Sequence, residues 1–132
     1  MYQHTDLTVP AREITHLLRE AMARMPDQCN GSFIVPYPFV PDCFADAHVL
    51  RLLVVGLLPN QQIAAHCDAS IAPAVRYHIP LQTFPGCWSY HDGLWQQLET
   101  GRVYRMDPTK PHGAVNWDSG IRLHLMIDVE AP

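Results

Sequence analysis

The sequence contains no long apolar run and no signal-peptide pattern. No segment reaches the roughly 20 apolar residues that a membrane-spanning helix needs. Its first residues, MYQHTDLTVP, lack the basic start and apolar stretch of a secretory signal. The four cysteines form no C-x-x-C pair and are too few for a disulfide scaffold. We therefore expect a cytoplasmic protein with reduced thiols and no membrane partner.

Charge is also scarce, and both signs are mixed along the chain. Nine Lys and Arg stand against 13 Asp and Glu, and charged residues make up 17% of the chain. The basic residues are scattered, so the basic patch that binds nucleic acid is missing. Hydrophobic residues make up 48% of the 132 residues, enough for one core and too few for two. We predict one domain over residues 1–132 without a nucleic-acid partner, and we leave its oligomeric state open.

Residues 1–47 are predicted to hold one helix and a covering segment. Over residues 10–25, apolar side chains recur at helical spacing, and Pro10 suits a first turn. Prolines and a glycine punctuate residues 26–46, a composition typical of loops and edge strands. The apolar positions of the helix are Ile14, Leu17, Leu18, Ala21 and Met25.

From residue 48 the chain is predicted to be all strand and turn. Seven short segments with period-two patterning and turn residues between them indicate a β-sandwich or barrel. Residues 94–99, after the Asp92-Gly93 turn, are left as a possible helical turn. The strand segments are 48–58, 61–68, 75–83, 87–91, 102–107, 112–116 and 121–129.

The last strand alternates most clearly. Leu and Ile occupy one side of residues 121–129, whereas Arg122, His124, Met126 and Asp128 occupy the other. Alternation alone allows this polar side to border either a cavity or solvent.

His66, Asp68 and His112 are the candidate metal ligands. Residues 66 and 68 are separated by one residue, so their side chains point to the same side of an extended strand. Alone, such a pair is equally consistent with a hydrogen-bonded turn that binds no metal. His112, at the start of a later strand, completes two histidines and one carboxylate. This is the facial triad of non-haem Fe(II) oxygenases, which leaves coordination positions open for a 2-oxo acid and O2.

Arg122 is the candidate anchor for the acid. It follows His112 across a short turn, so the two strands are expected to be neighbours. A guanidinium matches a carboxylate in two parallel hydrogen bonds. Taken alone, Arg122 could equally form a surface salt bridge.

Four motifs occur in order over about residues 48–129 and resemble a known family. Together they are similar to the aspartyl/asparaginyl beta-hydroxylase and bacterial proline hydroxylase family of Fe(II)/2-oxoglutarate-dependent dioxygenases. The resemblance implies a double-stranded beta-helix (jelly-roll, cupin-like) core over residues 48–132, with the helix packed outside. The motifs are R-Y-H-I-P-L-Q-T (76–83), W-Q-Q-L-E-T-G-R-V-Y-R-M-D-P (95–108), P-H-G-A-V-N (111–116) and R-L-H-L-M-I-D (122–128).

The resemblance also assigns roles. It implies that His66, Asp68 and His112 bind Fe(II), and that Arg122 anchors the distal carboxylate of 2-oxoglutarate. Arg76 and His78 match an R-x-H motif that also contacts this cosubstrate. The implied reaction uses O2 to hydroxylate an amino acid, a peptidyl side chain or an amino-acid-derived small molecule, with release of succinate and CO2.

The chain departs from the family at two points. Asn60 stands where relatives usually have glycine, a change that asparagine tolerates in a turn. The chain is also much shorter than typical members, which leaves the substrate open. As substrate-facing residues we suggest Trp88 and Tyr90.

Two other functions stay open. One is a cupin-like metal-binding barrel with a non-oxygenase role, such as an isomerase, lyase or sensor, because a fold does not fix a function. The other is a non-catalytic binding module.

Overall fold

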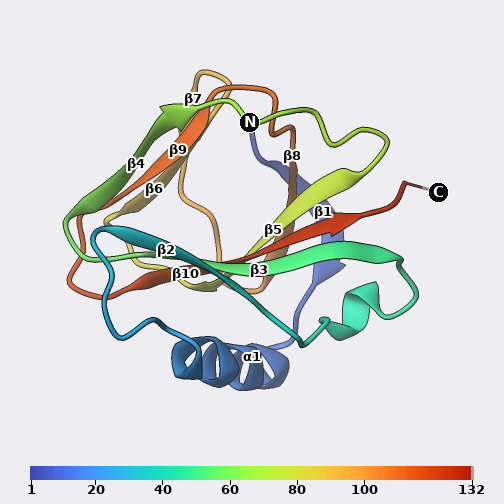
Figure 1. The fold of residues 1–132 in the computed structure, drawn as a ribbon, viewed down its shortest axis with the longest axis horizontal. Helices are drawn as coiled ribbons and strands as arrows, with labels where there is room; N and C mark the ends of the chain where they lie inside the picture. The colour runs from blue at the N-terminus through green and yellow to red at the C-terminus, as the bar shows by residue number, and fades with distance from the viewer. Residues whose placement is uncertain (132) are drawn as a thin grey trace.

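The computed structural model describes residues 1–131 as two antiparallel β-sheets with one α-helix packed outside them (Figure 1). The elements are β1 (Gln3–Thr8), α1 (Ala11–Ala23), β2 (Ser32–Pro36), the 3-10 turn η1 (Asp42–Phe44), β3 (Val49–Leu57), β4 (Gln61–His66), β5 (Val75–Gln82), β6 (Cys87–His91), β7 (Leu94–Gln96), β8 (Arg102–Met106), β9 (His112–Asn116) and β10 (Arg122–Val129).

The two sheets form the jelly-roll that the sequence predicted. The larger has the strand order β1-β8-β5-β10-β3-β2, and the smaller has the order β4-β9-β6-β7. In Figure 1, α1 lies below the large sheet, on the side away from the small sheet. The main hydrophobic core joins Ile14, Leu17 and Ala21 of α1 to this outer face of the large sheet. The inner face is therefore free to border a site between the sheets.

Strand β10 divides the core from this inner space. Leu123, Leu125 and Ile127 belong to the hydrophobic core. The other side of the strand is buried as well, with Arg122 3% exposed and Asp128 4% exposed. The polar side of β10 thus borders a cavity, and the solvent interpretation is wrong.

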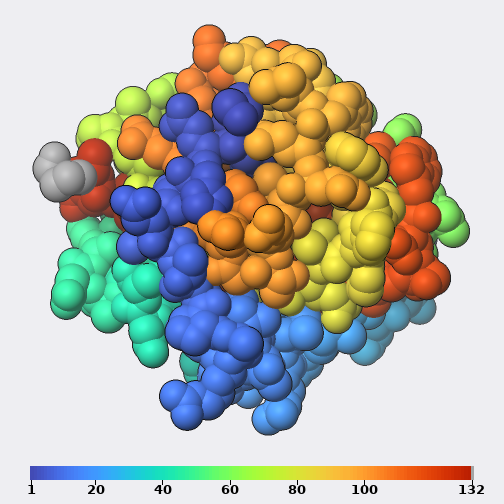
Figure 2. Space-filling model, turned by 180° about the vertical axis from the view of Figure 1, so that it is seen from behind, coloured from blue at the N-terminus to red at the C-terminus, as the bar shows by residue number. Residues whose placement is uncertain are grey.

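The N-terminal part contributes more than a helix. Strand β1, which we did not predict, pairs with β8 at one edge of the large sheet, and β2 pairs with β3 at the other. Figure 2 shows the N-terminal segment in dark blue packed along the surface against the orange segment that contains β8. Residues 26–46 do contain the predicted edge strand, β2.

Residues 94–96 form a strand and not the helical turn that we considered. Asp92 and Gly93 have φ angles of 49° and 90°, the left-handed pair that closes a two-residue hairpin. This turn folds β7 back against β6. Asn60 also has a positive φ, 58°, as expected where asparagine replaces glycine. No helix among residues 1–131 is long and apolar enough to cross a membrane.

Candidate metal centre

The three predicted metal ligands lie together at the edge of the small sheet. His66 of β4 stands directly opposite His112 of β9, and their ring centroids are 4.3 Å apart. Asp68 Oδ2 lies 3.2 Å from His112 Nε2, and Asp68 Oδ1 lies 3.6 Å from His66 Nε2. One ligand atom from each residue falls within 4.8 Å of the others, which is close enough for all three to reach one ion.

Asp68 reaches this position by a different route from the one we predicted. Strand β4 ends at His66, so strand alternation does not orient Asp68. Its backbone N–H instead donates to the Pro108 carbonyl, with N···O 2.8 Å. Arg76 Nη1 lies 3.3 Å from Asp68 Oδ2 and holds the carboxylate. Asp68 itself follows β4, and its hydrogen bond to Pro108, in the loop before β9, therefore positions it beside the two histidines.

Both histidines are oriented as metal ligands. Nδ1 of His66 lies 2.9 Å from the Ala64 carbonyl oxygen, and Nδ1 of His112 lies 2.8 Å from the Lys110 carbonyl oxygen. Because a carbonyl only accepts, each Nδ1 carries a proton, and Nε2, which faces Asp68, is the atom of each ring that is available to a metal. Backbone acceptors of this kind fix the ring of a ligating histidine. The donor set fits Fe(II), which takes two imidazoles and one carboxylate in open sites.

Gly113 allows the two ligand strands to approach each other. A Cβ added at Gly113 would stand 2.5 Å from the Ile63 carbonyl oxygen, which belongs to the backbone of β4. This separation is far below a normal van der Waals contact. A backbone oxygen cannot relieve it by a change of rotamer, as a side-chain atom can. The glycine after His112 therefore sets the spacing that places His66 opposite it.

We expect Gly113→Ala to push β4 away from β9. Overpacking of this kind destabilises a protein by about 1–3 kcal/mol, and here it would also separate His66 from His112. A metal titration should show weaker Fe(II) binding, and thermal unfolding should show a lower midpoint. Unchanged metal affinity would contradict this role; Gly120→Ala is the control for overpacking elsewhere, because the three nearest atoms to a Cβ there all belong to the Phe84 ring, the closest at 2.3 Å.

A cavity of about 520 Å³ lies between the sheets and contains the three ligands. This volume is in the range of small-molecule sites. Both sheets contribute polar side chains to it, whereas the apolar side chains of the strands come mainly from β2, β3 and β4. The lining includes Tyr2, Ile34, Arg51, Leu53, Val55, Ile63, His66, Asp68, Ile71, Arg76, His78, His112, Arg122 and Met126.

Arg76 is an ion-paired part of the cavity wall. Its Nε and Nη2 atoms donate to the two oxygens of Asp128 at 2.8 and 3.0 Å. Both side chains are 6% exposed. These hydrogen bonds to Asp128 raise the pKa of Arg76 above its usual value, against the effect of burial. The charge of Arg76 is thus balanced within the protein.

Arg122 is buried without such a partner. Its Nη2 atom lies 3.1 Å from His124 Nδ1 and 3.5 Å from Ser89 Oγ, and it has no carboxylate within ion-pairing distance among residues 1–131. Burial lowers the pKa of Arg122, yet a guanidinium stays protonated in proteins. A lone buried cation is costly, so this end of the cavity favours an anion.

The histidines beside Arg122 are neutral. Burial, followed by the nearby arginines, lowers the pKa of His78, and burial and Arg122 lower that of His124. Their Nδ1 atoms are 3.3 Å apart. Since Arg122 donates to His124 Nδ1, this atom accepts and His78 Nδ1 carries the proton. The histidines therefore add hydrogen-bonding groups without adding charge.

Trp88 and Tyr90 lie on the outer side of β6, so the structure does not bring them to the cavity. Trp88 is 39% exposed, whereas Ser89 between them is 4% exposed and faces Arg122. Tyr90 stacks on Trp95 of β7 instead, with ring centroids 5.2 Å apart. Strand β6 pairs with β9 in such a register that Ser89 and His91, and not Trp88 and Tyr90, share the side of His112.

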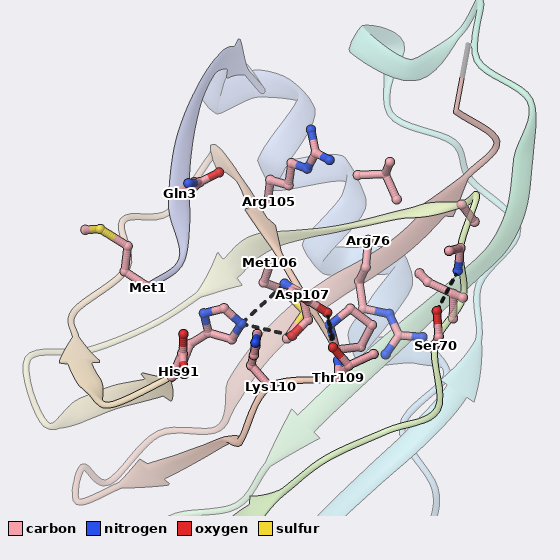
Figure 3. Close-up of a pocket in the computed structure, with 16 residues that line it drawn as sticks. Met1, Gln3, Ser70, Arg76, His91, Arg105, Met106, Asp107, Thr109 and Lys110 are labelled. Carbon is pink, nitrogen blue, oxygen red and sulfur yellow. Dashed lines mark hydrogen bonds between the residues drawn. The ribbon is translucent and has the colours of Figure 1, made fainter.

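A second, larger hollow of about 670 Å³ lies on the other side of Arg76 (Figure 3). Asp107 and Lys110 line it, and Figure 3 shows His91 hydrogen-bonded to the backbone of residue 107. It shares Ser70, Ile71 and Arg76 with the inter-sheet cavity but is lined by none of the three candidate ligands. The chemistry therefore belongs to the smaller cavity.

Two sequence comparisons relate the chain to known proteins. The sequence model of the aspartyl/asparaginyl beta-hydroxylase family matches residues 16–132. An L-proline cis-4-hydroxylase from Rhizobium meliloti (strain 1021) is 32% identical over 92 residues, which are 68% of this chain and 32% of that protein. The chain thus spans about a third of the length of that curated relative.

Solved structures share the fold. An oxidoreductase of the 2OG-Fe(II) oxygenase family from Burkholderia pseudomallei superposes with a TM-score of 0.65 at 15% identity, covering 91% of this chain and 78% of that one. A cupin domain from Bordetella pertussis tohama I superposes with a TM-score of 0.56 at 14% identity, covering 80% of this chain and 100% of that one. Because the family match extends over most of the sequence, the chain belongs to the aspartyl/asparaginyl beta-hydroxylase family.

Proposed function

We propose that this chain is an Fe(II)- and 2-oxoglutarate-dependent dioxygenase that hydroxylates an amino acid or a small molecule derived from one. The observation that carries the proposal is Arg122, a buried cation without a carboxylate partner in residues 1–131, in the same cavity as three converging metal ligands. The relative named as an L-proline cis-4-hydroxylase supports an amino-acid substrate.

In this proposal each side chain has a separate task. His66, Asp68 and His112 would hold the iron, and Arg122 would bind the distal carboxylate of 2-oxoglutarate through its free N–H groups. Arg76 keeps Asp68 in place, and Arg76 and His78 would border the bound cosubstrate. Bound Fe(II) supplies the oxidising chemistry, in which 2-oxoglutarate and O2 yield succinate, CO2 and the hydroxylated substrate.

The substrate would occupy the mainly apolar part of the cavity that β2 and β3 line, next to β10 in the large sheet. Ile34, Leu53 and Val55 line this part from β2 and β3. Arg51, also on β3, lines the same part, is exposed, and forms no ion pair within residues 1–131. A cation beside an apolar surface suits a small molecule with an apolar body and a carboxylate.

We expect Arg51→Gln to raise the KM for the amino-acid substrate by roughly 10-fold, because an exposed charge-assisted hydrogen bond is lost. The affinity for 2-oxoglutarate should not change. Steady-state kinetics with each compound varied in turn separates the two effects, and Arg19→Gln on the exposed side of α1 is the matched control. An equal rise of KM for both compounds would contradict the assignment.

The function can be tested directly by product analysis. The protein is supplied with Fe(II), 2-oxoglutarate, O2 and a panel of free L-amino acids that includes proline, and succinate and hydroxylated products are measured. Succinate is expected with the wild type and not with Asp68→Ala or without Fe(II). If no condition yields succinate and 2-oxoglutarate does not bind the iron-loaded protein, the proposal fails.

A further inference from the structure

Tyr2 is a buried tyrosine that the site described above does not use. It precedes β1 and is 3% exposed, and it lines the cavity with the metal ligands. Its ring meets that of His78 edge-on at 5.6 Å and that of His91 at 5.3 Å. These histidines belong to different sheets, so Tyr2 is inserted between the sheets where the cavity ends.

The backbone of Tyr2 is fixed from the small sheet. Its N–H donates to Gln96 Oε1 at 2.7 Å, and Gln96 Nε2 donates back to the Tyr2 carbonyl at 3.2 Å. Gln96 belongs to β7, whereas the strand that follows Tyr2 belongs to the large sheet. A residue held at two points in this way keeps its side chain in one position, which a binding group requires.

The hydroxyl of Tyr2 is free to bind a ligand. It makes no hydrogen bond within residues 1–131, although the phenol is almost completely buried. Burial raises the pKa of Tyr2, and the guanidiniums of Arg122 and Arg76 oppose this rise. The phenol therefore stays protonated, and it lies within the electrostatic reach of both arginines. A neutral O–H donor in the same cavity as a buried cation is well suited to a carboxylate oxygen.

We propose that the Tyr2 hydroxyl donates a hydrogen bond to the distal carboxylate of 2-oxoglutarate and so completes the acid subsite begun by Arg122. This inference rests on the proposed function. Tyr2 lies before residue 16, outside the part of the chain that the family model matches, so the subsite includes a residue contributed by this chain's own N-terminal segment. Gln96 is its positioning residue.

The test compares two acids that differ only at the distal end. Both have the same 2-oxo acid group, which would bind the metal. 2-Oxoglutarate continues to a distal carboxylate, whereas 2-oxobutyrate ends in a methyl group and lacks that carboxylate. Both are titrated by calorimetry into anaerobic, Fe(II)-loaded protein, using a C-terminal tag so that β1 is undisturbed. The variant is Tyr2→Phe. The control is Tyr104→Phe, which removes a buried hydroxyl that accepts from the Glu99 N–H outside the cavity.

Tyr2→Phe is expected to weaken 2-oxoglutarate binding by roughly 10- to 100-fold, the effect of losing a hydrogen bond to a charged group. Its affinity for 2-oxobutyrate should not change. The control Tyr104→Phe should bind both acids as the wild type does. Unchanged 2-oxoglutarate affinity, or equal weakening for both acids, would overturn the inference and leave the proposed function standing. A wild-type protein that binds neither acid would overturn the proposed function first.

Discussion

Replacement of Arg122 with methionine is expected to weaken 2-oxoglutarate binding by at least roughly 100-fold and to leave Fe(II) binding unchanged. Removing one partner of a buried charge pair costs about 2–5 kcal/mol, and each 1.4 kcal/mol is about tenfold in affinity. Arg122 is 3% exposed and lies in the cavity that holds the candidate ligands. Water therefore cannot easily take over the hydrogen bonds that the guanidinium would make to the carboxylate. Anaerobic calorimetry with iron-loaded protein measures the change.

The stability of the same variant separates a binding residue from a structural one. Arg122→Met removes a buried cation that has no carboxylate partner in residues 1–131, so the thermal midpoint should stay the same or rise. Arg76→Met is the matched comparison. It leaves Asp128 buried and unpaired, which should cost about 3–5 kcal/mol of unfolding free energy. Equal destabilisation by both changes would contradict the ligand role of Arg122.

The alternative of a metal-binding barrel without a 2-oxo acid makes the opposite prediction. Cupin domains share this fold, and a cupin-like isomerase, lyase or sensor would need His66, Asp68 and His112 but not Arg122. Its metal-dependent activity would survive Arg122→Met. This alternative also gives no physical reason for the buried guanidinium of Arg122, which has no carboxylate partner within residues 1–131.

Replacement of His112 with alanine is expected to abolish succinate formation and to weaken Fe(II) binding by more than about 100-fold. Even residues that only support a metal ligand contribute about 10- to 100-fold in affinity, and His112 would be a ligand itself. Its side chain is 11% exposed and held by the Lys110 carbonyl, so no neighbour can take its place without moving that loop. Iron titration and succinate analysis measure the two effects.

The matched control for His112→Ala is His48→Ala. His48 has a side chain that is 69% exposed and pairs with Glu130, so its loss should change neither iron affinity nor succinate formation. Full iron binding by His112→Ala would contradict the proposed metal centre.

The sequence predicted the jelly-roll well where alternation was strong. Strand β10 was predicted over its full length, with one extra residue at its start, and its two sides were separated correctly. Alternation only indicates that the sides differ, however, and cannot say what covers each of them. The structure shows that α1 packs on the side of the apolar residues, while Arg122 on the other side lines the cavity between the sheets.

The site was predicted in part because its motifs keep their order along the chain. His66, Asp68 and His112 converge as expected, but Asp68 does so from a loop, which strand periodicity does not describe. Trp88 and Tyr90, suggested as substrate-facing, lie on the side of β6 away from His112, which is decided by the register with β9. Sequence reasoning missed Tyr2 in the cavity and Ser89 behind Arg122.

Different reasons explain these two omissions. Tyr2 precedes a mostly polar strand, β1, whose alternation gives no apolar signal, and it lies far from every motif in the sequence. Ser89 lies between two aromatic residues, and a single serine adds no hydrophobic signal of its own to the pattern. Pairing of distant strands decides both positions, and residue patterns within one segment do not contain that information.

The most direct test of the account is an anaerobic titration of 2-oxoglutarate into the protein with and without Fe(II), followed by absorbance or calorimetry. Saturable, equimolar binding is expected that requires the metal, is lost in His112→Ala and is strongly weakened in Arg122→Met. Absence of binding to the iron-loaded wild type, or binding of equal strength without iron, would contradict a site in which His66, Asp68, His112 and Arg122 act together.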